Sequence, residues 1–161
     1  MVNAIIASLL FARTPHELRM ILVDPKRVEL SGYNGLPHLL VPVITESEKA
    51  ASALKWAVLE MERRYRLFAE AGARNIEGYN ETRVDALDRI PFVVVVIDEA
   101  DAALGNREAS GDSGTQARVF AQIASFMADT RNRGKILWFL ITCRPDLLPI
   151  DLKRQGRAEE H

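Results

Sequence analysis

Runs of apolar residues separated by polar turns divide this chain into alternating strands and helices. The run over 92–97 is apolar at every position, which is typical of a strand in the middle of a parallel sheet that helices cover on both faces. Runs over 18–23 and 136–142 predict two further strands, and 39–44 predicts a short one. The alternation with helical segments predicts an α/β fold, a three-layer sandwich with a mainly parallel sheet.

Helical periodicity is strongest over 46–71. Apolar residues recur there at three- and four-residue steps, at Ala50, Ala53, Leu54, Ala57, Val58, Met61, Tyr65 and Phe68. Thr45 and Glu48 predict a capping box at the start of this helix, and Gly72 ends it. Segments 1–12 and 115–130 predict two more helices, whereas 75–89 is polar with helical content and 105–114 is the most loop-like stretch.

Composition narrows the function classes. A chain of 161 residues, 48% hydrophobic, fits one domain over 1–161. The balance of 21 basic against 22 acidic residues gives no positive field that would hold a nucleic acid. The single Cys143 excludes an internal disulfide and a cysteine-based zinc site, which fits a cytoplasmic location. No apolar run approaches the roughly 20 residues that a membrane helix needs, so we expect no membrane segment.

The strongest chemical signal is the apolar strand 92–97 followed by Asp98 and Glu99, which is the Walker B arrangement. A buried strand delivers its last residues rigidly to the carboxyl edge of the sheet, where ligands of open α/β folds bind. There Asp98 would hold Mg²⁺, and Glu99 would polarise the water that attacks a γ-phosphate. The alternative is a buried strand that ends in two solvated acids.

The partner of that motif, the phosphate-binding loop G-x-x-x-x-G-K-[ST], does not occur in the sequence, since Gly134 and Lys135 are followed by Ile136. Without it the chain lacks a nest of backbone N–H groups, a lysine for the β- and γ-phosphates and a hydroxyl ligand for the metal. We therefore expect no cofactor to bind tightly and no ATP hydrolysis by this chain alone.

Several motifs closely resemble the motor domain of the FtsK/SpoIIIE DNA translocases. They lie at 2–10 (VNAIIASLL), 24–30 (DPKRVEL), 33–39 (YNGLPHL), 60–65 (EMERRY) and 74–80 (RNIEGYN), and the resemblance covers residues 2 to about 91. In that family the Walker A loop lies immediately before the position of Val2. The resemblance implies a P-loop NTPase fold of the RecA/AAA+ type that lacks the Walker A strand and loop, with Mg-ATP as cofactor and DNA as partner in the parent families.

From about Phe92 the resemblance shifts to an AAA+ ATPase, through 98–107 (DEADAALGNR), 142–149 (TCRPDLLP) and 151–157 (DLKRQGR). The chain would thus consist of a translocase-like part, 1–91, and an AAA+-like part, 92–161, joined as an engineered chimera. By position, Thr142 rather than Cys143 takes the sensor-1 place that orients the attacking water. Arg154 and Arg157 take the place of arginine fingers that reach a neighbouring subunit's nucleotide. Their alternative is a solvated basic helix end.

Three functions remain open. The first is a truncated, designed P-loop ATPase core, inactive alone, with adjacent strands 136–142, 93–97 and 18–23 and with 1–12 covering one face of the sheet. Its exposed strand 136–142 would mediate self-association. The second is an ATP-dependent DNA translocase or AAA+ remodelling motor, and the third is an interaction module that docks on ATPase subunits. Mg-ATP titration by calorimetry separates the first from the second.

Other features have simpler interpretations. Gly111 to Gly114 (GDSG) is similar to the nucleophile region of a serine protease, but the α/β pattern favours a flexible loop. Arg63 and Arg64 could touch phosphate, yet the glutamates around them favour a solvated helix face held by i,i+4 pairs. We expect His38 to pack within a loop.

Overall fold

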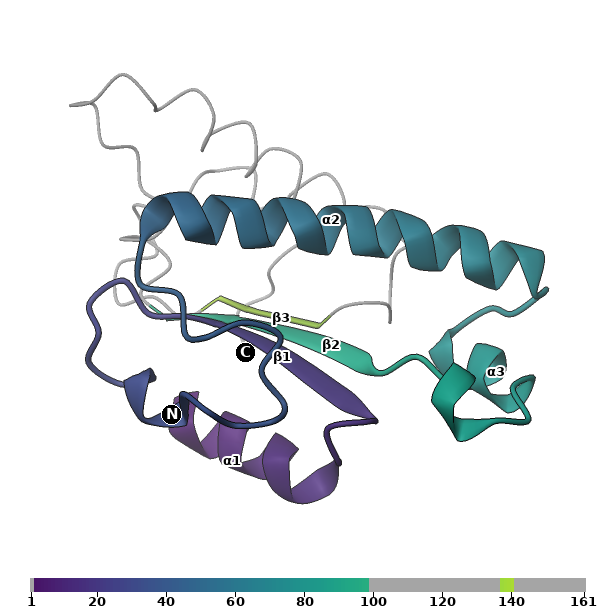
Figure 1. The fold of residues 1–161 in the computed structure, drawn as a ribbon, viewed down its shortest axis with the longest axis horizontal. Helices are drawn as coiled ribbons and strands as arrows, with labels where there is room; N and C mark the ends of the chain where they lie inside the picture. Colours follow the sequence, from purple (N-terminus) through teal and green to yellow (C-terminus); the bar gives the residue numbers. More distant parts are fainter. Residues whose placement is uncertain (1, 99–136, 141–161) are drawn as a thin grey trace.

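The fold is a parallel sheet between two helices (Figure 1). A computed structural model describes residues 2–98 and 137–140. Within them, β1 (Leu18–Val23), β2 (Phe92–Ile97) and β3 (Leu137–Leu140) form one parallel sheet in the order β1-β2-β3. This confirms the predicted α/β class and the predicted order of these strands.

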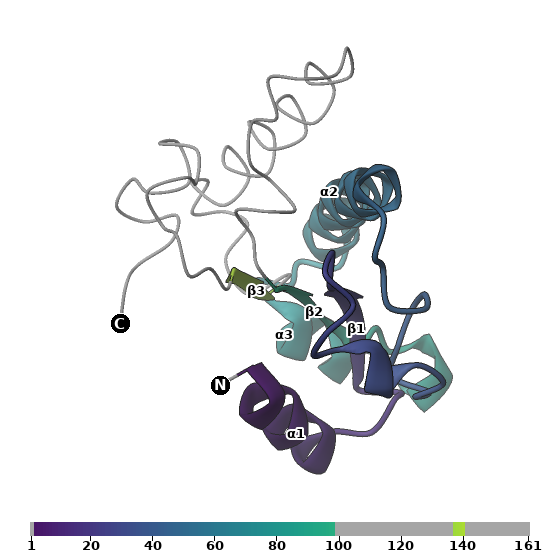
Figure 2. The ribbon, with the colours of Figure 1, turned by 90° about the vertical axis from the view of Figure 1, so that its left-hand side faces the viewer.

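Helices lie on both faces of the sheet (Figures 1 and 2). On one face α1 (Val2–Ala12) buries Val2 and Ile6 in a core with alternate residues of the strands, among them Met20 and Val94. Side chains alternate across a strand, so that the other residues of β1 and β2 face the second helix, α2 (Ser47–Glu70). The expectation that the N-terminal segment covers one face is therefore confirmed.

The segment 39–44 pairs with β1 only at its two ends. Instead of a continuous strand it makes isolated parallel bridges, Leu39 with Met20 and Ile44 with Val23. Pro42 lies between the bridges and has no N–H to donate to a ladder. The predicted strand 39–44 is thus wrong as a regular strand, although its residues do lie along the free edge of β1.

The helix α2 matches the predicted helix 46–71 to within one residue at each end. Its start differs from the prediction, because Glu46 is the N-cap residue and no side chain caps the helix, so the Thr45–Glu48 capping box is wrong. Its end is as predicted. Gly72 has φ 64°, and the N–H of Ala73 donates to the carbonyl of Phe68 at 2.8 Å, which is the Schellman arrangement.

The buried stripe of α2 contains a charged residue. Ala50, Leu54, Ala57, Val58, Met61 and Phe68 are buried, as predicted. Tyr65, however, is 46% exposed, and Arg64 is only 2% exposed. The steps from Met61 to Arg64 and from Arg64 to Phe68 are three and four residues, so helical geometry puts Arg64 on the stripe. The prediction of a solvated Arg63–Arg64 pair is therefore wrong for Arg64.

The polar segment after α2 folds into short helical turns, α3 (Ile76–Glu81) and η2 (Ala86–Asp88), while η1 (Ser31–Tyr33) follows β1. Asn75 caps α3 by accepting from the N–H of Gly78 at 2.8 Å. Ile76 and Tyr79 pack with Phe68 of α2 in a second, smaller core. No helix in the described part of the chain is long and apolar enough to cross a membrane.

Candidate functional site

Two acidic residues lie side by side at the carboxyl edge of the sheet. Val23 and Ile97 are paired at the ends of β1 and β2, so Asp24 and Asp98 follow at the same level. The N–H of Asp98 donates to the carbonyl of Val23 at 2.9 Å, which extends the ladder by one step. Asp24 is 1% exposed and Asp98 9% exposed. The structure therefore places Asp98 at the carboxyl edge of the sheet, and its role as a Walker B residue stays a prediction.

Asp24 is engaged by its own loop. Its Oδ2 accepts from the backbone N–H groups of Glu29 at 3.1 Å and Leu30 at 3.0 Å. These bonds close the turn after β1, in which Arg27 adopts the left-handed conformation with φ 59°. These two hydrogen bonds satisfy the buried carboxylate of Asp24 within its own loop. We assign Asp24 to the loop and Asp98 to the candidate site.

Asp98 can supply one ligand to a magnesium ion. Mg²⁺ retains several waters and binds proteins through one or two carboxylates together with substrate phosphates, so a single carboxylate at this edge fits the ion. Among residues 2–98 and 137–140 no group of three His, Cys, Asp or Glu side chains is arranged to hold a metal. Glu99, Thr142, Arg154 and Arg157 lie outside the described residues, so their roles stay predictions.

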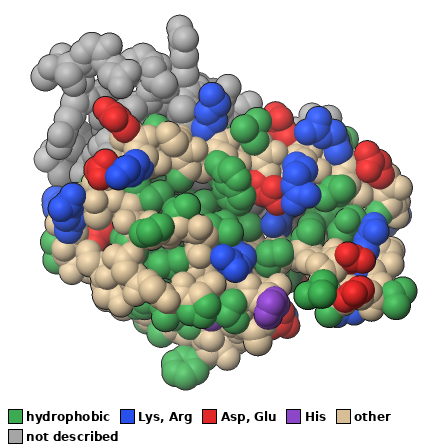
Figure 3. All heavy atoms as spheres, in the orientation of Figure 1, with side chains coloured by type: hydrophobic (Ala, Val, Ile, Leu, Met, Phe, Trp, Pro, Cys, Tyr) green, Lys and Arg blue, Asp and Glu red, His purple; other side chains and the backbone are tan. Residues whose placement is uncertain are grey.

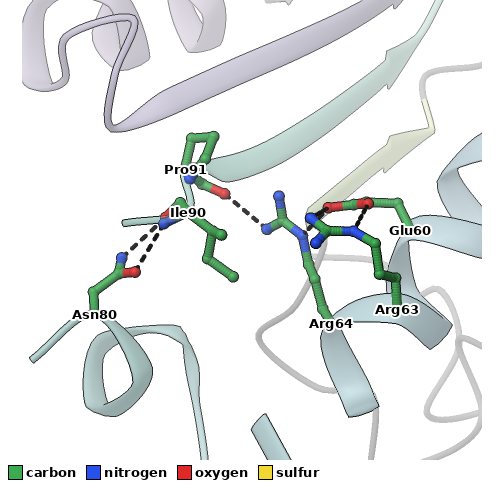
Figure 4. A network of polar contacts seen from close by, with 6 residues as sticks. All are labelled: Glu60, Arg63, Arg64, Asn80, Ile90 and Pro91. Atoms are coloured by element: carbon green, nitrogen blue, oxygen red, sulfur yellow. Dashed lines mark hydrogen bonds and ion pairs between the residues drawn. The ribbon is translucent and has the colours of Figure 1, made fainter. Parts of the chain in front are cut away.

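The opposite end of β2 is held by side chains from two helices (Figure 4). From α2, Arg64 donates through Nη1 to the carbonyl of Pro91 at 2.7 Å. From α3, the amide of Asn80 forms two bonds of 2.9 Å with Ile90, donating to its carbonyl and accepting from its N–H. The backbone that leads into β2 is therefore fixed immediately before the strand begins.

Glu60 completes this cluster as the counter-ion of two arginines. Its Oε1 accepts from Nε of Arg64 at 2.7 Å, and its Oε2 accepts from Nε of Arg63 at 2.7 Å. Burial alone raises the pKa of the Glu60 carboxyl, but the hydrogen bonds from Arg63 and Arg64 outweigh burial and hold the pKa below its ordinary value of 4.5. Burial lowers the pKa of the Arg64 guanidinium, against the hydrogen bond to Glu60, yet an arginine remains charged at neutral pH.

Arg64 and Asn80 were not predicted as positioning residues. The three- and four-residue spacing around Arg64 and its i,i+4 relation to Glu60 were visible in the sequence. The contacts to Ile90 and Pro91 join segments that are separated by loops, and hydrophobic periodicity does not predict such contacts.

His38 is 8% exposed, with Nε2 2.9 Å from the carbonyl of Arg13, which confirms its packing within a loop.

Comparison with known families identifies the chain. The sequence model of the protein family described as "FtsK/SpoIIIE family" matches residues 1–143 of this chain. The chain belongs to the FtsK/SpoIIIE family. The match runs without a break through residue 91, where the sequence motifs had suggested a change to an AAA+ ATPase. It gives no support to an engineered chimera, and that interpretation is withdrawn.

Curated relatives of this FtsK/SpoIIIE-family chain include DNA translocases from several bacteria. The DNA translocase FtsK of Oceanobacillus iheyensis is 53% identical, over 61% of this chain and 13% of the relative. That of Halalkalibacterium halodurans is 49% identical, over 76% and 16%. DNA translocase SpoIIIE of Bacillus subtilis is 51% identical, over 61% and 13%. The alignments thus cover only 13–16% of the length of these relatives.

Solved structures support the fold assignment. ATPases 2 and 3 of EssC from Geobacillus thermodenitrificans match with a TM-score of 0.70 at 21% identity, over 92% of this chain and 26% of that chain. The pCW3 conjugation coupling protein TcpA, solved with ATPγS, matches with a TM-score of 0.66 at 21% identity, over 88% and 38%. At such identity the likeness shows the fold alone. It is the α/β fold of P-loop ATPase domains, as predicted.

Proposed function

We propose that this FtsK/SpoIIIE-family chain forms the Walker B side of an ATP-driven DNA translocase motor. The observation that carries the proposal is the position of Asp98, at the carboxyl end of the central strand of a parallel sheet. Ligands of open α/β sheets bind at this edge. The curated relatives are named DNA translocases, and this supports DNA as the substrate that is moved.

The proposed chemistry assigns one task to each residue. Asp98 ligates the magnesium ion of Mg-ATP, which neutralises charge on the phosphates when it is bound. Glu99 follows directly in the chain and polarises the attacking water, which Thr142 orients. Arg154 and Arg157 act on the nucleotide of a neighbouring subunit. The last four assignments concern residues outside the described part of the chain and rest on their positions in the sequence.

The cluster at the other end of β2 supports this proposal by keeping the strand in place. A catalytic carboxylate acts best when its backbone has little freedom to move. The ladder from Phe92 to Ile97 pairs with β1 along its full length, and Arg64 and Asn80 fix the two residues before it. Asp98 is thus held by a strand that is anchored at both ends.

The 161 residues contain no G-x-x-x-x-G-K-[ST] sequence, so we expect this stretch by itself to bind Mg-ATP only weakly. The inactive, designed core that the sequence first suggested is replaced by a natural motor segment whose activity needs a phosphate-binding loop. A cytoplasmic location is part of the same proposal, because a motor that uses ATP works where ATP is present.

A graft tests the proposal. Residues 2–143 of this chain replace the matching stretch of Bacillus subtilis SpoIIIE, and DNA-stimulated ATP hydrolysis is measured. The graft is expected to hydrolyse ATP, and Asp98→Asn is expected to abolish hydrolysis. Asp88→Asn is the matched control, since Asp88 is an exposed acid in η2.

A further inference from the structure

We propose that Lys26 contacts the γ-phosphate of ATP bound at the carboxyl edge of the sheet, so that the site distinguishes ATP from ADP. Lys26 is an exposed residue of the turn 24–30, which follows β1 directly. The inference rests on the proposed function, because it requires Mg-ATP at Asp98. It adds to that function a residue from the end of a second strand.

The turn 24–30 begins beside Asp98. Val23 and Ile97 are paired in the register of β1 and β2, and the N–H of Asp98 donates to the carbonyl of Val23 at 2.9 Å. Adjacent strands lie ~4.8 Å apart, and two residues span at most roughly 7 Å, so the Cα atom of Lys26 lies within about 12 Å of that of Asp98. The long side chain of a lysine and a triphosphate held through Mg²⁺ on a carboxylate together span such a distance.

Hydrogen bonds within the turn give Lys26 a fixed backbone. The buried carboxylate of Asp24 accepts through Oδ2 from the N–H groups of Glu29 at 3.1 Å and Leu30 at 3.0 Å. The N–H of Arg27 donates to the carbonyl of Asp24 at 3.3 Å. A segment that is already held in one conformation loses little conformational entropy when it binds a ligand. Asp24 is thus a positioning residue for Lys26.

The neighbouring cation, Arg27, acts on a different acid. Glu46 is the N-cap residue of α2. Its hydrogen bond with Lys49 is the main cause that lowers the pKa of its carboxyl, and the charge of Arg27 lowers this pKa further. Figure 3 shows basic and acidic side chains together at the end of the molecule where the turn 24–30 and the start of α2 lie. Arg27 is therefore a control for Lys26, with the same charge in the same turn.

The charges at this edge favour a cation beside the phosphates. Asp24 is 1% exposed and Asp98 9% exposed, and Glu99 follows Asp98 in the chain. A magnesium ion neutralises only part of the negative charge of these carboxylates and a triphosphate. A lysine ammonium is a compact charge on a flexible stem, which suits a phosphate oxygen. A contact with the γ-phosphate is lost in ADP, so Lys26 would favour ATP.

Nucleotide affinity tests the inference in the graft of residues 2–143 into Bacillus subtilis SpoIIIE. The dissociation constants of ATPγS and ADP are measured with Mg²⁺ by calorimetry for the unchanged graft, Lys26→Met, Lys26→Arg and Arg27→Met. We expect Lys26→Met to weaken ATPγS binding about 10-fold or more, as for loss of a charge-assisted hydrogen bond, and to leave ADP binding unchanged. Lys26→Arg is expected to retain most of the preference for ATPγS, and Arg27→Met all of it.

Equal weakening of both nucleotides in Lys26→Met would overturn the inference, because it would show a structural role for the turn. So would lower DNA affinity with an unchanged preference for ATPγS, as expected of a contact with DNA, or an equal loss of preference in Arg27→Met. The proposed function is tested separately by Asp98→Asn. If that variant alone abolishes hydrolysis while Lys26→Met keeps the preference, only this inference fails; a graft that binds neither nucleotide overturns both.

Discussion

Arg64 of α2 donates a hydrogen bond of 2.7 Å to the carbonyl of Pro91, the residue that precedes β2. The two residues are 27 positions apart in the chain, and the guanidinium that joins them is buried beside its partly buried counter-ion Glu60. A buried charge is tolerated in a protein only when it is paired and hydrogen-bonded. The contact thus fixes the start of β2, the strand that Asp98 follows. Removing Arg64 would take a hydrogen-bond donor from both Glu60 and Pro91.

Replacing Arg64 by Met is expected to destabilise the chain by about 1–3 kcal/mol, because it leaves the Pro91 carbonyl unpaired and removes one of the two arginines that pair with the partly buried Glu60. The free energy of unfolding is measured by urea denaturation. Arg63→Met is the matched control, since Arg63 binds the same carboxylate but is 51% exposed. An exposed pair contributes only about 0–1 kcal/mol. Equal losses for both variants would contradict the assignment of the structural role to Arg64.

The Glu60 carboxylate makes stability depend on pH. Its pKa is lower in the folded chain than its ordinary 4.5, so its contribution is present above about pH 4.5 and is lost as the pH falls through the folded value. The difference in unfolding free energy between wild type and Glu60→Gln is therefore expected to be constant between about pH 5 and about pH 7, where Glu60 is ionised in both the folded and the unfolded chain. It is expected to shrink below pH ~4.5. Thermal unfolding of both proteins across this range measures the difference. A difference independent of pH would exclude the ion pair.

The backbone conformation of Gly72, at the end of α2, is expected to affect stability independently of side-chain contacts. Gly72 has φ 64°, and no atom lies within 4 Å of the place that a β-carbon would take, so Gly72→Ala meets no clash but imposes the left-handed conformation on an alanine. The expected loss is about 1–2 kcal/mol. Gly32 is the control, because it also has open space around it and its φ is not positive. Similar unfolding midpoints for Gly72→Ala and Gly32→Ala would show that the Schellman turn does not require glycine.

Patterns of hydrophobicity were sufficient for the main elements of this fold. The valine-rich run over 92–97 predicted the central strand, and the stripe on α2 predicted which face is buried, because burial of apolar area dominates both choices. The edge segment 39–44 was misjudged, since apolar residues there suggested a strand while Pro42 interrupts the ladder.

The cluster formed by Glu60, Arg64 and Asn80 could not be predicted from hydrophobic patterns. Arg64 occupies a core position on α2, but its charge excluded it from a stripe that was chosen by hydrophobicity. Its partner Pro91 and the Asn80–Ile90 pair depend on how α2, α3 and β2 meet, which is tertiary information. The candidate site was easier to locate, because Asp98 follows a buried strand and the carboxyl edge of a parallel sheet is a general ligand-binding position.

The central claim is that Asp98 serves ATP hydrolysis in a DNA translocase motor. The most direct measurement is the rate of DNA-stimulated ATP hydrolysis by the SpoIIIE graft with Asp98→Asn, relative to the same graft with Asp88→Asn. Loss of an electrostatic group at a reacting centre lowers the rate by about 100-fold or more. We expect that loss for Asp98→Asn and a rate near that of the unchanged graft for Asp88→Asn. Equal rates for the two variants would contradict the account.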